Sequence, residues 1–103
     1  MIEGVDINLG GIVYTVPPLS FKQLRILQPK LDILQQIGNM PSDDQLAVVS
    51  EIVHMALSRN YPDITLDQVN ENLDLGNMKK VLPAILGVSG LVTTVGEEQA
   101  GTL

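Results

Sequence analysis

The sequence contains no cysteine, and this absence excludes several kinds of chemistry at once. Without thiols the chain has no disulfide, no thiolate nucleophile and no thiolate metal ligand. Only 3% of the residues are aromatic although 45% are hydrophobic, so a core must be built mainly from Leu, Ile, Val and Met. At 103 residues the chain is long enough for one such core, and we predict a single domain.

Basic residues are also scarce. The chain has six Lys and Arg residues and twelve Asp and Glu residues, which gives a formal net charge of -6 at pH 7. This balance opposes binding to phosphate backbones and to anionic membrane surfaces, so we expect neither nucleic acid nor a membrane as partner. No uninterrupted apolar run approaches the roughly 18 residues of a membrane span, and residues 1–4 do not form a basic and apolar export signal. We expect a soluble protein that is not exported.

Alternating apolar and polar residues on both sides of Gly10-Gly11 predict an N-terminal β-hairpin. Two adjacent glycines permit the positive φ of a tight turn. The resulting register places six large apolar side chains on one face, in the pairs Leu9 with Ile12, Ile7 with Tyr14 and Val5 with Val16. A lone hairpin is marginal in water, so this face must be covered by helices or by another sheet.

Three capping boxes mark the starts of helices, at residues 20–23, 42–45 and 65–68. We predict helices over about 21–37, 43–60 and 66 to 73 or 74, and we expect Pro29 to kink or split the first. Gly76-Asn77 is interpreted as a chain break before a fourth apolar face that begins at Met78. Pro83 leaves open whether this fourth helix continues or a separate turn begins.

These elements define the predicted fold class, a mainly α, small single domain of three to four helices with an N-terminal β-hairpin (α+β). The domain is expected to span residues 1–92. Residues 93–103 lack periodic apolar spacing and are expected to form a flexible C-terminal tail.

Catalytic and metal-binding patterns are weak. Glu51 and His54 have the Glu-x-x-His spacing of dimetal helical bundles, but the chain has only one His and so lacks the second pair that such a site needs. On a helical wheel both residues fall opposite or beside the apolar stripe, and we expect them to be solvated. No nucleophile elbow or phosphate-binding glycine motif is present. We predict no catalytic residues, no metal, no cofactor and no enzymatic activity.

The helices carry more apolar residues than one neighbour covers. In the first helix, Leu24, Leu27, Leu31 and Leu34 form one stripe, and a second lies roughly 120° away at about 100° per residue. Two interpretations stay open. A kink, a buried central helix or domain packing covers the surplus, or it forms a partner or self-association surface. The candidate partner-binding residues are Ile26, Ile33, Ile37, Val48 and Met55.

Four segments between Leu19 and Leu91, taken in order, resemble the tail assembly chaperones of tailed bacteriophages and prophages. They are Leu19–Arg25 (LSFKQLR), Ala56–Asp63 (ALSRNYPD), Leu73–Met78 (LDLGNM) and Ala84–Leu91 (AILGVSGL). None is a catalytic signature. The resemblance implies a small, acidic, helical protein of the bacterial host cytoplasm. Such proteins bind the tape measure protein during tail assembly and are absent from the mature virion.

Under this resemblance, the apolar surplus would cover hydrophobic helix faces of the tape measure protein before the tail tube encloses them. Many copies along one filament would amplify a modest individual affinity. The tail tube protein and a second copy of this chain are further candidate partners. An alternative is a structural tail-completion or connector component, whose hairpin edge would add to a neighbouring sheet. An acidic carrier protein is a third class, but the Asp-Ser-Leu attachment site of acyl carrier proteins is absent.

Overall fold

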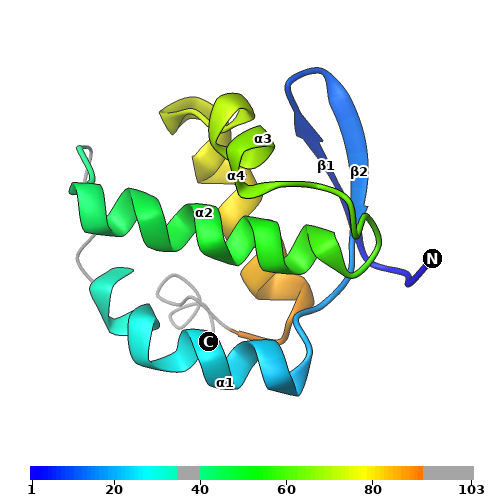
Figure 1. The fold of residues 1–103 in the computed structure, drawn as a ribbon, viewed down its shortest axis with the longest axis horizontal. Coiled ribbons are helices and arrows are strands. Elements are labelled where there is room, and N and C mark those ends of the chain that lie inside the picture. Colours follow the sequence, from blue (N-terminus) through cyan, green and yellow to red (C-terminus); the bar gives the residue numbers. More distant parts are fainter. Residues whose placement is uncertain (35–39, 92–103) are drawn as a thin grey trace, which may run out of the picture.

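The computed structural model describes residues 1–34 and 40–91, in which a hairpin precedes four α-helices (Figure 1). The predicted α+β class is therefore confirmed. The elements are β1 (Val5–Leu9), β2 (Ile12–Val16), α1 (Phe21–Leu31), the 3-10 turn η1 (Asp32–Leu34), α2 (Asp43–Ser58), α3 (Leu66–Asn72) and α4 (Leu75–Val88). The predicted tail from residue 93 onward lies outside the described residues.

The hairpin has the predicted register, with the pairs Leu9–Ile12, Ile7–Tyr14 and Val5–Val16. Gly10 and Gly11 take φ values of 61° and 85°, which glycine adopts without a steric penalty. The expectation that the whole apolar face is covered is wrong at the turn. Ile12 is exposed there, whereas the strand positions further from the turn are buried or half-buried against the helices.

The first helix is shorter than predicted. Its start after Ser20 is confirmed, with both hydrogen bonds of the capping box to Gln23 in place. The helix passes through Pro29 but ends two residues later at Leu31, where the backbone tightens into η1. Proline has no N–H to donate to the preceding turn, so the α-helical hydrogen-bonding pattern weakens at this point. The remainder of the predicted helix, residues 35–37, lies outside the described residues.

The fourth helix begins earlier than predicted, and the interpretation of Gly76-Asn77 as a chain break is wrong. Asp74 and Asn77 form a fourth capping box, in which the Asp74 N–H donates to Asn77 Oδ1 at 2.9 Å and the Asn77 N–H donates to Asp74 Oδ1 at 2.8 Å. Asparagine replaces the usual Gln or Glu, so the motif was not recognised. Pro83 lies inside the helix, which continues to Val88.

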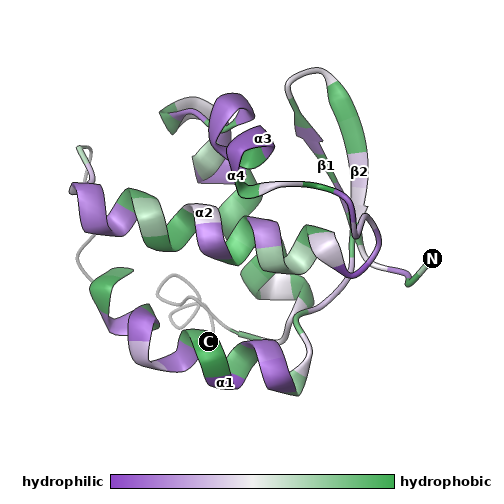
Figure 2. Ribbon diagram, in the orientation of Figure 1, coloured by the Kyte–Doolittle hydropathy of each residue, from purple (hydrophilic) through white to green (hydrophobic). Residues whose placement is uncertain are grey.

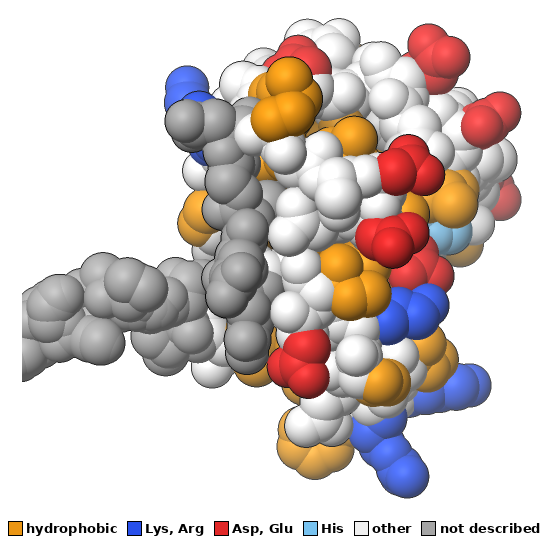
Figure 3. Space-filling model, turned by 90° about the vertical axis from the view of Figure 1, so that its left-hand side faces the viewer, with side chains coloured by type: hydrophobic (Ala, Val, Ile, Leu, Met, Phe, Trp, Pro, Cys, Tyr) orange, Lys and Arg blue, Asp and Glu red, His pale blue; other side chains and the backbone are white. Residues whose placement is uncertain are grey.

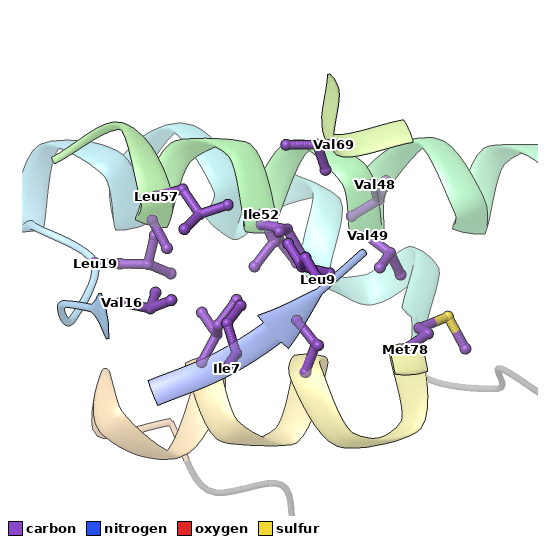
Figure 4. Packing of buried hydrophobic residues seen from close by; sticks show 14 of the residues in the cluster. Ile7, Leu9, Val16, Leu19, Val48, Val49, Ile52, Leu57, Val69 and Met78 are labelled. Carbon is purple, nitrogen blue, oxygen red and sulfur yellow. The ribbon is translucent and has the colours of Figure 1, made fainter. Parts of the chain in front are cut away.

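The core is built around α2, which contacts α1, η1, α3, α4 and β2. Figure 4 shows buried side chains of β1, α2 and α4 gathered in one layer between α2 and α4. Coloured by hydropathy, α2 carries apolar residues on more than one side (Figure 2). The largest fully buried aliphatic side chains are Leu9, Leu27, Ile52, Leu57 and Ile85. A central helix therefore absorbs much of the apolar surplus seen in the sequence.

Candidate functional site

The five candidate partner-binding residues do not form one exposed surface. Ile26 on α1 and Ile33 in η1 are exposed. Val48 is only 5% exposed and belongs to the core, and Met55 is half-buried against that core. The expectation that Val48 lies on an accessible face is therefore wrong, because α1 and η1 pack over that side of α2. Ile37 lies outside the described residues.

Ile26, Ile33 and Met55 border the seam between α1 and α2, which polar side chains close. Lys30 Nζ donates to both carboxylate oxygens of Glu51 at 2.9 Å, and both side chains are about one-third exposed. Two capping-box glutamines hold the ends of the seam. Gln23 Nε2 donates to the Met55 carbonyl at 2.7 Å, and Gln45 Nε2 donates to the Ile33 carbonyl at 2.9 Å. A partner would have to displace these contacts to reach the apolar layer beneath.

Glu51 and His54 point to different neighbours. Glu51 pairs with Lys30 of α1, whereas His54 Nε2 lies 3.0 Å from the Ile64 carbonyl oxygen in the segment before α3. Both side chains are half-buried, so the expectation that they are simply solvated is wrong. Within residues 1–34 and 40–91, no group of three or more His, Asp or Glu side chains is arranged to hold a metal ion.

A hollow of about 300 Å³ lies where the N-terminal end of α2 meets the junction of α3 and α4, and we call it the α2 groove. Its rim carries three exposed apolar side chains, Met40 at 81%, Leu46 at 41% and Leu75 at 37%. Val49 and Met78, both buried, line its inner part. The α2 groove is therefore an apolar depression with buried apolar side chains inside it and exposed apolar side chains at its rim.

The polar side chains that line the α2 groove are already engaged. Ser50, itself buried, donates from Oγ to Asn70 Oδ1. Asp74 Oδ1 accepts the Asn77 N–H that begins α4. The lining therefore offers few free groups for orienting a polar ligand.

Charged side chains surround this end of the molecule. Figure 3 shows the face that includes the N-terminal end of α2, where hydrophobic patches alternate with acidic side chains, mainly in the upper half. Asp43 precedes Leu46 by three residues and Ser50 by seven, so helical spacing puts it on the groove side of α2. Asp67 likewise precedes Asn70 by three residues on α3. Lys79 follows Leu75 by one turn of α4, so it adds a basic side chain on this side.

A second hollow, of about 260 Å³, lies along α1, and we call it the α1 groove. Phe21, which is 86% exposed, lines it together with Leu24, Leu31 and Leu91. Arg25 also lines it, and α1 contains no acidic residue. The two grooves therefore differ in the sign of the charge beside them.

The hairpin edge, which the connector hypothesis requires, is partly occupied. The Thr15 N–H donates to Tyr61 Oη at 2.9 Å, and the Thr15 carbonyl accepts from Asn60 Nδ2 at 2.9 Å. The Tyr61 ring also packs edge-on against Tyr14, with ring centroids 5.1 Å apart. On the other strand, β1 packs against α4. Strand addition at Thr15 would therefore have to displace existing hydrogen bonds.

The described residues thus define a small α+β domain whose notable surface features are apolar grooves. None of its described helices is both long and apolar enough to cross a membrane. Comparison with known proteins finds no matching family, no matching characterised protein and no matching solved structure.

Sequence reasoning missed the α2 groove for two identifiable reasons. Leu46 has the apolar spacing of the buried residues of α2, which does not distinguish an exposed position from a core position, and Leu75 lies between the predicted third and fourth helices. The available signal was the Asp74–Asn77 capping box, which would have brought Leu75 into the first turn of α4.

Proposed function

We propose that this chain is a tail assembly chaperone of a tailed bacteriophage or prophage. In this role it binds apolar helix faces of the tape measure protein in the bacterial host cytoplasm, keeps that protein soluble during tail assembly and is absent from the mature virion. The proposal joins the order of the four family-like segments to the apolar surface left at the N-terminal end of α2.

The observation that carries the proposal is the exposed apolar rim of the α2 groove in a strongly acidic chain. Large apolar side chains grouped around a hollow are typical of a surface that a partner covers. Methionines at the rim and in the lining suit such a surface, because the flexible thioether adapts to partners of varied shape. The net charge of -6 would keep a complex with an apolar partner soluble.

A binding role is favoured over a catalytic one by the state of the polar side chains. The polar residues in the α2 groove are engaged in hydrogen bonds within the domain, and Glu51 and His54 face different neighbours. General acid–base catalysis needs titratable groups that converge on one cleft. We therefore propose a non-enzymatic protein that requires no cofactor.

The tail-completion or connector role remains the alternative proposal. The exposed Ile12 and Val13 next to the hairpin turn favour it, because they present apolar side chains beyond the helices. The hydrogen bonds that already occupy Thr15 weigh against addition of a strand along β2.

Co-expression tests the proposal. The chain is produced together with the long helical tape measure protein encoded in the same genome, and the soluble fraction is compared with that of tape measure expressed alone. We expect a soluble complex and no copies of the chain in purified virions. A tape measure protein that stays insoluble would contradict the chaperone role, and abundant copies in virions would favour the connector role.

A further inference from the structure

We propose that the α2 groove binds an amphipathic helix whose apolar side chains are flanked by Lys or Arg. This inference rests on the proposed function and names the kind of tape measure segment that the chaperone recognises. Three properties of the groove support it: its size, the engagement of its polar groups and the charge beside it.

The size of the α2 groove suits side chains better than a whole small-molecule ligand. Its volume of about 300 Å³ stands at the lower end of the range of about 300 to 1,000 Å³ for ligand pockets. Leu46 and Leu75 stand at the rim and Val49 lies inside, so an inserted aliphatic side chain would contact apolar atoms on several sides. Recognition of a helix by a groove relies on such anchors, spaced three or four residues apart.

The polar groups of the groove favour a helix over an extended peptide. An extended peptide needs hydrogen-bonding partners for its backbone, whereas a helix satisfies its own backbone internally. Ser50 and Asn70 are bonded to each other, and Asp74 caps α4. The groove therefore offers apolar contact without the row of free donors and acceptors that strand addition requires.

The charge beside the groove selects the flanks of the helix. Asp43, Asp67 and Asp74 supply three carboxylates, and Lys79 offsets one of them. The N-terminal ends of α2 and α4 each contribute about half a positive charge. The rim therefore stays negative by about one charge, within a chain whose net charge is -6. Lys or Arg beside the apolar anchors would be attracted, and Asp or Glu would be repelled.

Two synthetic helices provide the probes. Both carry the same Leu and Ala face, and one is flanked by Lys and the other by Glu. Binding to the full chain is followed by fluorescence anisotropy at low salt. We expect the Lys-flanked helix to bind about tenfold or more tightly than the Glu-flanked helix. Equal affinities for the two probes would overturn the proposed charge selection.

Substitutions then locate the binding surface. The double variant Leu46→Ser, Leu75→Ser should weaken binding of the Lys-flanked helix about tenfold or more. The matched control, Ile12→Ser with Val13→Ser, removes two exposed apolar side chains from the hairpin and should leave affinity unchanged. Wild-type affinity in the groove variant, or an equal loss in the control, would overturn the assignment.

Charge variants test the same groove without touching its apolar residues, and they remain informative if the double variant fails to fold. Asp43→Asn should weaken binding of the Lys-flanked helix about twofold to fivefold, and Lys79→Gln should strengthen it by a similar factor. Glu3→Gln removes a distant exposed carboxylate and serves as the control. Identical affinities for Asp43→Asn, Lys79→Gln and wild type would contradict the proposal.

Two further measurements separate this inference from other outcomes. A dimer in sedimentation equilibrium that Leu46→Ser dissociates would mean that a second copy occupies the groove, which overturns the inference. If the groove variant still forms a soluble complex with tape measure, the groove assignment fails and the chaperone role stands. If wild type binds the Lys-flanked helix but not tape measure, the chaperone role fails and the groove's preference stands.

Discussion

The two ends of α2 have the same apolar spacing but are covered to different extents. In its C-terminal half, Ile52, Val53 and Leu57 are completely buried. At its N-terminal end, Leu46 lies on the same apolar stripe and remains exposed beside the α2 groove. Apolar periodicity therefore identifies the side of a helix that faces its neighbours, whereas the position of those neighbours determines where the covered part of that side ends.

Polar contacts reinforce the difference. Beyond the C-terminal end of α2, Asn60 receives the Ile2 N–H at 2.7 Å and donates to the carbonyls of Ile2 and Thr15 at 2.8 and 2.9 Å. Arg59 also donates to the Pro18 carbonyl. These bonds tie the segment after α2 to the hairpin and to the loop before α1. At the groove end, Gln45 donates to the Ile33 carbonyl and Ser50 donates to Asn70, but Leu46 and Leu75 at the rim stay exposed, so we regard it as the open end.

The largest expected contrast is between two Leu→Ala substitutions on α2. Leu57→Ala creates a cavity at a completely buried site and should lower the free energy of unfolding by about 2 to 5 kcal/mol. Leu46→Ala removes a side chain that is already half in water and should cost about 1 kcal/mol or less. Urea denaturation of both variants measures the difference. Equal losses would show that the two ends are equally packed.

The next prediction concerns the hydrogen bonds by which Asn60 joins the C-terminal side of α2 to the hairpin. Asn60→Ala removes three hydrogen bonds and leaves the Thr15 carbonyl without its side-chain donor. We expect a loss of about 1 to 3 kcal/mol in the free energy of unfolding. Amide exchange should also accelerate at Ile2, whose N–H loses its acceptor. A melting temperature equal to that of wild type would mean that these bonds contribute nothing to closing this end.

Much of this architecture was predictable because its signals are local. The capping boxes at Ser20, Ser42 and Thr65 bring donor and acceptor together within three residues, so the sequence alone reveals them. The hairpin register follows from two glycines at the turn. The fourth box escaped recognition because Asn77 replaced the expected Gln or Glu.

The candidate site was less predictable because it depends on tertiary neighbours. Val48 and Ile33 both belonged to the surplus of apolar residues, yet one is buried and the other exposed. The difference arises from where α1 and η1 cross α2, which no local pattern specifies. The α2 groove also depends on how the junction of α3 and α4 is placed beside Leu46, because both line the hollow.

A smaller contrast separates the two glutamines that begin helices and also join α1 to α2. Gln23→Glu keeps the oxygen that accepts the Ser20 N–H but loses the donor to the Met55 carbonyl, and it should cost about 1 kcal/mol. Gln45→Glu makes the same exchange at a more exposed position, where water can bond the Ile33 carbonyl in place of the lost donor, and should cost less than about 0.5 kcal/mol. Chemical denaturation of both variants measures the two losses in the free energy of unfolding, and an equal loss in both would contradict the expected difference.

The ion pair across the α1–α2 seam should also contribute little to stability. Lys30 and Glu51 are each about one-third exposed, so Lys30→Met should change the free energy of unfolding by about 0.5 kcal/mol. The effect should shrink in high salt, because salt screens exposed charges. A loss of several kcal/mol that persists in high salt would show that the seam depends on this pair far more than its exposure implies.

The four methionines report where on the chain the tape measure protein binds. Met40 and Met78 line the α2 groove, Met55 lies under the α1–α2 seam, and the Met1 sulfur lies 4.0 Å from Tyr61 Oη beside the hairpin. Methyl NMR of 13C-labelled methionine is recorded while the tape measure protein is added. If tape measure binds in the α2 groove, the Met40 and Met78 resonances shift while those of Met55 and Met1 stay in place. A shift of Met55 or Met1 with Met40 and Met78 unchanged would contradict binding in that groove.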